Sequence, residues 1–185
     1  MSMFKAMIPL FSVVTIGCLS TQIPVYAQAQ TSLKSFNFSE KVAVAFPITG
    51  DRDDAIANGR MRTSFTLTKN GELSAVTNTR TKVKLAGFTG AASIILVDAN
   101  KRPIWASGVH SYGVDGCLIG KCKRNDNWSE KVPSEIMSRV RGYAILQQHN
   151  PQWRIFDRGE QFLRWLGSNE GKATVTTIAS IVAMF

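Results

Sequence analysis

The stretch from Gly108 to Cys122 of this 185-residue chain gathers the residue types that could carry out covalent chemistry. It reads GVHSYGVDGCLIGKC and contains one of the chain's two histidines. Nucleophilic catalysis needs a hydroxyl or thiol beside a base, with a third group that orients the base. Ser111 or Tyr112 could supply the hydroxyl, His110 the base and Asp115 the orienting carboxylate. The sequence therefore offers a candidate catalytic loop for a hydrolase.

The same stretch also fits a purely structural interpretation. Its four glycines allow tight turns and close backbone approach. No G-x-S-x-G motif surrounds Ser111, and neighbouring residues on a strand point to opposite faces, which would separate Ser111 from His110. Under this interpretation the stretch is a turn between two strands.

Composition permits two kinds of metal site, and spacing argues against both. Two histidines and two cysteines could form a zinc site, but His110 and His149 lie far apart with Cys117 and Cys122 between them. The acidic cluster at residues 51–54 could attract calcium, but it lacks the glycine and the distal glutamate of an EF-hand loop. We predict no metal and no cofactor.

The elements that would position these residues follow an export signal at residues 1–29. Lys5 supplies a basic start, and Met7–Cys18 is an apolar run of the length found in signal peptides. Ala27-Gln28-Ala29 matches a signal peptidase site, which predicts cleavage before Gln30 and a secreted or periplasmic location. The apolar run is shorter than the roughly 20 residues that span a bilayer, so we expect no integral membrane span after cleavage.

Cysteine usage follows from this signal. Cys18 could be lipidated in an alternative interpretation, but Thr15 stands where a lipobox has a large aliphatic residue. Cleavage would leave only Cys117 and Cys122, and an even count in an oxidising compartment predicts a disulfide that closes a short loop.

Residues 30–185 are the size of one globular domain. Alternating polarity and turn signals predict an α+β protein: an antiparallel β-sandwich or small barrel over residues ~35–110, followed by two or three C-terminal helices. Asn70-Gly71 marks a hairpin between two of the strands. The expected strands are residues 35–46, 60–68, 73–77, 80–85, 92–97 and 103–109, with a loop over 47–59.

The helical part is expected to begin after Val132-Pro133. Apolar residues from Ile136 to Leu146 recur at helical spacing, and Asn150-Pro151 starts a second helical segment that ends before Gly167. The tail at residues 173–185 suits a helix by its spacing, although its β-branched content also suits a strand. We predict that this tail is a buried helix.

Charge carries the strongest functional signal, because the chain has a formal net charge of +9. A basic surface attracts acidic polysaccharides, lipid head groups or nucleic acid, of which nucleic acid is not favoured for an exported protein. Trp128 lies in a polar stretch, so we expect it to be exposed and able to stack on a ligand. The expected binding residues are Arg60, Arg62, Arg80, Lys82, Lys84 and Trp128.

Three functions follow from these features. The first is an exported binding protein that recognises an anionic surface or polymer. The second is an exported hydrolase that uses residues 110–115. The third is an envelope-associated protein that contacts lipid through its apolar C-terminal tail.

Overall fold

The computed structural model describes residues 44–118 and 120–184. The predicted signal peptide, its cleavage site and Cys18 lie outside the described residues, as does most of the strand predicted over residues 35–46.

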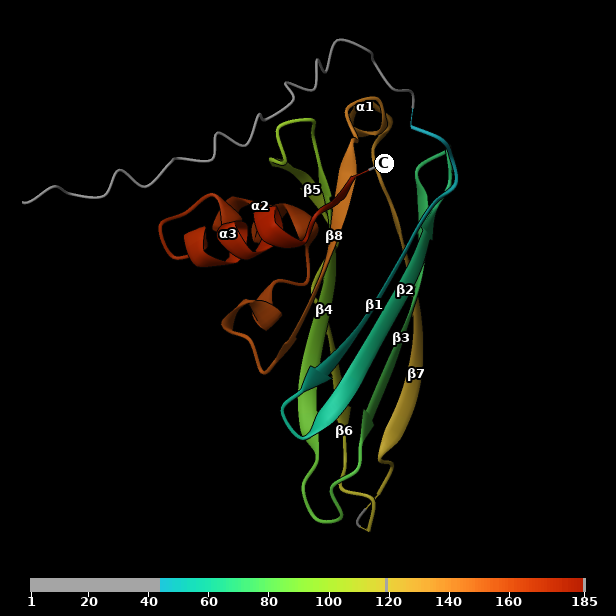
Figure 1. Ribbon diagram of the computed structural model, residues 1–185, viewed down its shortest axis with the longest axis vertical. Coiled ribbons are helices and arrows are strands. Elements are labelled where there is room, and N and C mark those ends of the chain that lie inside the picture. The colour runs from blue at the N-terminus through green and yellow to red at the C-terminus, as the bar shows by residue number, and fades with distance from the viewer. Residues whose placement is uncertain (1–43, 119, 185) are drawn as a thin grey trace, which may run out of the picture. The chain divides into compact units, whose positions relative to one another are not determined.

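Two antiparallel sheets face each other and form a β-sandwich (Figure 1). Sheet A has the order β1-β2-β3-β7, and its strands are β1 (Ile48–Ile56), β2 (Gly59–Leu67), β3 (Glu72–Thr81) and β7 (Lys123–Lys131). Sheet B has the order β5-β4-β8-β9, with β6 also paired to β4; its strands are β4 (Phe88–Val97), β5 (Pro103–Ala106), β6 (His110–Val114), β8 (Gly142–His149) and β9 (Ala183–Met184). The predicted fold class, an antiparallel sandwich followed by helices, is confirmed.

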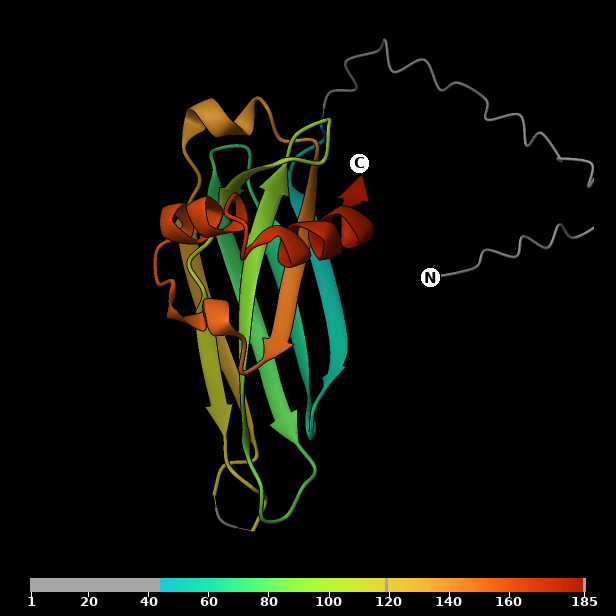
Figure 2. The same cartoon turned by 90° about the vertical axis from the view of Figure 1, so that its left-hand side faces the viewer.

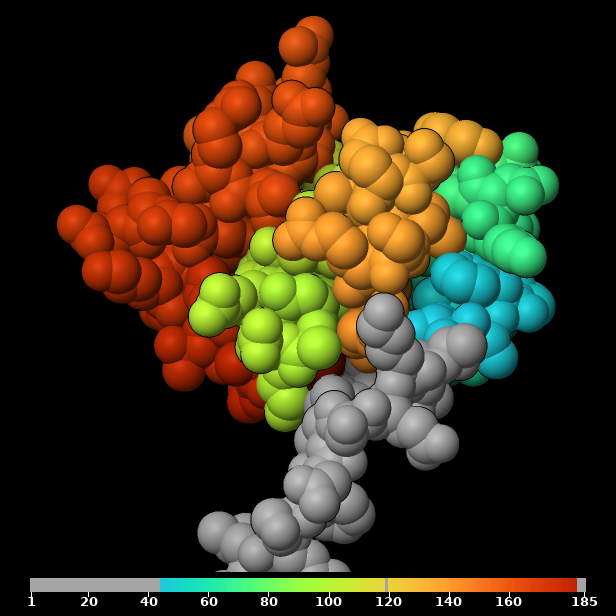
Figure 3. Space-filling model, turned by 90° about the horizontal axis from the view of Figure 1, so that it is seen from above, coloured from blue at the N-terminus to red at the C-terminus, as the bar shows by residue number. Residues whose placement is uncertain are grey.

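The helices cover the outer face of sheet B. Figure 2 shows α2 (Gly159–Leu166) and α3 (Lys172–Ile181) crossing the strands β4 and β8. A short helix, α1 (Ser134–Met137), lies at one end of the sandwich, and Figure 3 shows it between the β2–β3 turn and the β4–β5 turn. A 3₁₀ helix, η1 (Gln152–Ile155), leads from β8 towards α2.

Strand β4 lies at the centre of the molecule because it is apolar on both faces, as predicted for residues 92–97. Ile94 and Leu96 pack towards sheet A, whereas Ile95 and Val97 pack towards the helices. All four side chains are almost completely buried. Burial on both sides removes the polar alternation of a surface strand and explains the continuous apolar run.

The β2–β3 hairpin is also confirmed. Inward Met61 and Phe65 alternate with outward Arg60 and Arg62 along β2. The turn places Gly71 at φ +80°, a backbone conformation that glycine adopts without strain. Strand register then follows from Leu67 opposite Leu73 to Gly59 opposite Thr81.

Two predictions near these strands are wrong. Residues 47–59 are not a loop, since β1 occupies most of them, and its acidic side chains are neutralised by arginines instead of being solvated in a turn. The strand predicted over residues 80–85 does not exist as a separate element: β3 continues to Thr81, and residues 82–87 form a loop.

The predicted helix around Ile136 to Leu146 is also wrong beyond its first turn. Helix α1 ends at Met137, and the chain forms a strand, β8, from Gly142 onward. Every residue of β8 pairs with β4, which explains why this segment is extended. Buried residues stand in a row in the middle of β8, so apolar spacing alone could not distinguish this strand from a helix. The sandwich therefore extends well past residue 110, through β7 and β8.

The tail is a helix to Ile181, as expected, and it belongs to the core. Ile178 is completely buried in a cluster with Phe162 and Leu166 of α2, and Val175 and Ile181 pack against the same cluster. Within the described residues, no helix is long and apolar enough to cross a membrane. The apolar side of the tail is thus occupied by packing on the protein itself.

Substituting Ile178→Ala should lower the free energy of unfolding by about 2–5 kcal/mol, because it leaves a cavity beneath α3. Ala179→Ser, on the exposed side of the same helix, is the matched control and should change stability little. Chemical denaturation measures both. Equal, small effects of the two variants would contradict a core role for the tail.

Candidate functional site

The structure separates the residues of the candidate catalytic loop. His110 and Tyr112 point inward from β6, whereas Ser111 between them is exposed on the opposite face. Asp115 follows the strand and is exposed in the next loop. The alternation of a strand therefore prevents a Ser111–His110 pair, as the structural interpretation of this stretch anticipated.

The partner of His110 is a carboxylate from the other sheet. Its Nε2 lies 3.0 Å from Oε1 of Glu130 on β7, and the carboxylate accepts this hydrogen bond. The imidazole also stacks on the Trp128 indole, with ring centroids 4.0 Å apart. A hydrogen bond from Nε2 and stacking on one face of the ring therefore fix the imidazole of His110. Both contacts join β6 to β7.

Glu130 holds a second group at the same place. Its Oε1 also accepts a hydrogen bond of 2.9 Å from the backbone N–H of Gly108. Gly108 lies between β5 and β6, where the backbone pairing with β4 is interrupted. At this interruption a side chain takes the place of a backbone acceptor, because the Ser107 hydroxyl accepts a hydrogen bond of 3.0 Å from the N–H of Ile94. One carboxylate oxygen thus ties the irregular edge of sheet B to sheet A.

Further along the same edge, Tyr112 and Arg124 continue the contact between β6 and β7. The guanidinium of Arg124 lies 5.5 Å from the Tyr112 ring centroid, donates to the carbonyl of Gly113 and pairs with Asp126. Burial raises the pKa of Tyr112 well above its usual value, although nearby Thr77 opposes the shift. A phenol held in its neutral form is a poor nucleophile. We name this line of contacts the β6–β7 seam; it comprises Gly108, His110, Tyr112, Arg124, Trp128 and Glu130.

The prediction that Trp128 is exposed is wrong. Its indole points between the sheets, and Nε1 donates a 3.2 Å hydrogen bond to the Thr77 hydroxyl. The surrounding sequence is polar because β7 is an edge strand whose inward face carries Arg124, Asp126 and Glu130 as well as Trp128. Inward charges are one way in which proteins keep a sheet edge from pairing with other chains.

Sequence reasoning missed Glu130 entirely. An alternation of apolar and polar residues along residues 123–131 would have revealed β7. Trp128 is the only apolar residue of this strand, however, and the other inward positions carry charged side chains. Pairing across the seam depends on the register of β7 against β3, which no local pattern specifies.

The acidic cluster in β1 is a set of ion-pair partners. Among the described residues, no three His, Cys, Asp or Glu side chains come close enough to hold a metal ion. Each aspartate of the cluster instead contacts an arginine, and a hydrogen bond from Arg60 lowers the pKa of Asp53. The pairs are Arg62–Asp51, Arg60–Asp53 and Arg52–Asp54.

Strand register aligns three cations on the outer face of sheet A. Arg60 of β2 lies opposite Arg80 of β3, and Arg80 lies opposite Lys123 of β7. Adjacent strands are about 4.8 Å apart, so these side chains start from neighbouring positions. We call Arg60, Arg80 and Lys123 the basic row. In the described part of the chain, Arg80 and Lys123 form no ion pair.

Two hollows flank the basic row. One of about 250 Å³ is lined by Arg60, Arg62 and Arg80 together with Asp53 and Asn78. The other, of about 310 Å³, lies towards the β1–β2 turn, and its charged lining residues are Arg60, Arg80 and Lys82. Arg60 and Arg80 therefore border both hollows and can present their guanidinium groups to a ligand in either.

Of the remaining predicted basic residues, two lie in a loop at the same end and one lies on the sheet. Lys82 and Lys84 are exposed in the loop after β3, and Arg62 stays on the sheet, where it is bound to Asp51. The loop that contains the cysteines contacts the loop after β3, because the backbone N–H of Cys117 donates to the carbonyl of Val83 at 3.0 Å. Both cysteines are free thiols in this structure.

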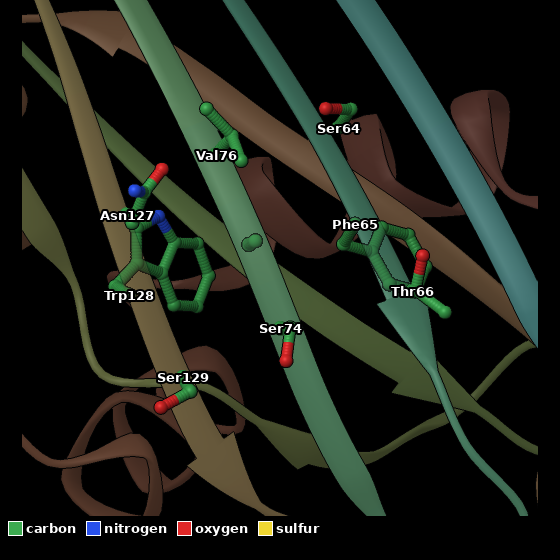
Figure 4. Close-up of a pocket in the computed structure, with 9 residues that line it drawn as sticks. Ser64, Phe65, Thr66, Ser74, Val76, Asn127, Trp128 and Ser129 are labelled. Carbon is green, nitrogen blue, oxygen red and sulfur yellow. The ribbon is translucent and has the colours of Figure 1, made fainter.

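A separate groove of about 530 Å³ crosses the outer face of sheet A (Figure 4). Short polar side chains surround it, and none of the lining residues is charged. Such a lining can hydrogen-bond a neutral ligand but offers no acid, base or ion pair. The residues that line it belong to β2, β3 and β7: Ser64, Phe65, Thr66, Ser74, Ala75, Val76, Asn127, Trp128 and Ser129.

Comparison with protein-family models, curated proteins and solved structures found no match to this chain.

Substituting Glu130→Ala should lower the free energy of unfolding by about 1–2 kcal/mol, because the N–H of Gly108 and the imidazole of His110 both lose their acceptor. Glu72→Ala is the matched control: its carboxylate is exposed and 3.9 Å from Lys131, so its removal should matter little. Urea denaturation distinguishes the two, and equal effects would show that the seam contributes nothing specific.

Proposed function

We propose that this chain is an exported β-sandwich protein that binds an anionic ligand through the basic row. The observation that carries the proposal is the strand register, which places Arg60, Arg80 and Lys123 side by side on three adjacent strands. Like charges that lie directly opposite each other destabilise a sheet. A bound anion would relieve this repulsion.

The chemistry of the row supports the same conclusion. Arginine presents a planar fork of donors that matches carboxylate, sulfate or phosphate oxygens in two parallel hydrogen bonds. The hollows beside Arg60 and Arg80 give such oxygens room to approach. Asp53 neutralises only part of the charge, since it pairs with Arg60 alone and leaves Arg80 and Lys123 available.

Export is part of the proposal and rests on the N-terminal sequence. The basic Lys5, the apolar run Met7–Cys18 and the Ala27–Ala29 site occur in the order that signal peptidase recognition requires. A polycationic surface outside the cytoplasm would meet the acidic polymers and lipid surfaces of cell envelopes.

An oxidising location should join Cys117 to Cys122. The two thiols are already neighbours, since a contact with Cys122 raises the pKa of Cys117. The disulfide should add about 2 kcal/mol of stability, the amount expected for a very short loop. Alkylation of the exported protein without reductant, followed by mass spectrometry, should label neither cysteine. Labelling of both would show that the pair is reduced in place.

Neutralising the row should weaken anion binding. The double variant Arg80→Gln/Lys123→Gln should bind a soluble sulfated polysaccharide such as dextran sulfate at least about tenfold more weakly, because it loses two charged contacts to sulfate groups. The loss of these contacts should also reduce the salt dependence of binding. Isothermal titration at two salt concentrations measures both effects.

The matched control removes the same charge elsewhere. Arg154→Gln/Lys69→Gln takes one exposed arginine and one exposed lysine from outside the row. If net charge alone determined binding, both double variants would lose affinity equally, and the assignment to the basic row would be wrong.

A further inference from the structure

Two loops at one end of the sandwich each expose a leucine. Leu85 in residues 82–87 has 72% of its surface exposed, and Leu118 in residues 115–118 has 69%. Figures 1 and 2 both show these loops side by side at the end of the sandwich opposite α1. A single exposed leucine is common in proteins, but two on adjoining loops form an apolar feature with no cover among the described residues.

Backbone contacts hold the two leucines in this position. The N–H of Cys117 donates to the carbonyl of Val83 at 3.0 Å, and that of Leu118 donates to the carbonyl of Lys84 at 2.9 Å. Gly116 allows this approach, because a Cβ there would lie 2.6 Å from the Lys84 carbonyl oxygen. The loops are therefore built against each other, and their backbones are held together by these bonds.

Thr81 anchors the pair of loops to the sheet. It is almost completely buried, its N–H donates to the carbonyl of Cys122 at 2.8 Å, and its hydroxyl donates to the carbonyl of Asn58 at 2.9 Å. The same hydroxyl accepts from the N–H of Val83 at 3.1 Å. This residue connects the leucine-bearing loops to the β1–β2 turn and hence to the basic row.

Lysines share the two loops with the leucines. Lys82, Lys84 and Lys121 are exposed in the two loops, and none of them forms an ion pair within the described part of the chain. Asp115 is the one carboxylate in these loop sequences. Lys123 and Arg80 of the basic row lie next to these loops along the chain, so this end of the sandwich combines two exposed leucines with several cations.

We propose that this two-loop tip, defined as Lys82, Lys84, Leu85, Leu118 and Lys121, docks on the surface of an anionic phospholipid bilayer. The inference rests on the proposed function, since the basic row behind the tip would meet the same head groups. Leucine side chains enter the acyl boundary while lysine ammonium groups stay at the phosphates, the arrangement of a peripheral membrane contact. A dissolved polyanion offers charge but no apolar phase, so it would leave both leucines in water.

The test compares single variants in the same full chain, so that its N-terminal apolar run contributes equally to each. Sedimentation with vesicles of phosphatidylglycerol mixed with phosphatidylcholine measures partition. Leu85→Ser and Leu118→Ser should each weaken partition by about tenfold, the loss expected from one buried leucine. Ile155→Ser is the matched control, because Ile155 is 74% exposed on η1 and lies outside the tip. All three variants should unfold at the temperature of the parent protein.

Several outcomes would overturn the proposal. Leucine variants that partition like the parent would show that Leu85 and Leu118 do not contact the vesicles. Equal partition onto phosphatidylcholine vesicles would remove the role of the lysines. A parent that binds dextran sulfate but no vesicle would identify a soluble polymer as the partner.

The proposed function fails separately. It fails if Arg80→Gln/Lys123→Gln binds dextran sulfate as tightly as the parent, whatever the leucine variants do. Conversely, leucine variants should bind dextran sulfate normally, because the polymer does not need an apolar contact. The two readouts therefore distinguish an error about the basic row from an error about the tip.

Discussion

Strand β4 has no polar face, and the rest of the described structure follows from covering both of its sides. Ile94 and Leu96 require a second sheet, which β1, β2, β3 and β7 provide, whereas Ile95 and Val97 require the helical layer of α2 and α3. Apolar burial of this kind is the dominant favourable term in folding. The C-terminal tail is therefore recruited to the core, which explains why a sequence rich in β-branched residues ends as a packed helix.

The two open sides of the sandwich are closed by polar contacts, in two different ways. On one side, Glu130 links Gly108 and His110 across the β6–β7 seam. On the other, Arg52 of β1 donates to the carbonyl of Ile145 on β8, and Gln147 donates back to the carbonyl of Arg52. Edge strands need such protection, because their free backbone groups can pair with other chains. His110, a candidate catalytic residue in the sequence, thus helps to connect the two sheets at this edge.

Ion pairing divides the cations on the outer face of sheet A into two groups. The β1 aspartates neutralise Arg60 and Arg62 at one border of sheet A, whereas Arg80 and Lys123, further across the sheet, form no ion pair among the described residues. Ligand recognition at a loop-bearing end fits the general division in which a rigid sheet provides the scaffold and loops provide the contact. The proposed anion binding and the proposed membrane contact both use this end.

Local sequence determined the elements whose pattern is set by their own residues. The alternation of β2, the glycine of the hairpin at Gly71, the doubly apolar β4 and the amphipathic tail were all predictable, because each has a periodicity imposed by burial. Tertiary structure decided the rest. Strand β8 exists because β4 needs a partner, and the basic row and the Glu130 contact exist because strand register brings together residues far apart in the chain. Register depends on the sum of pairings across a whole sheet, so no single segment contains it.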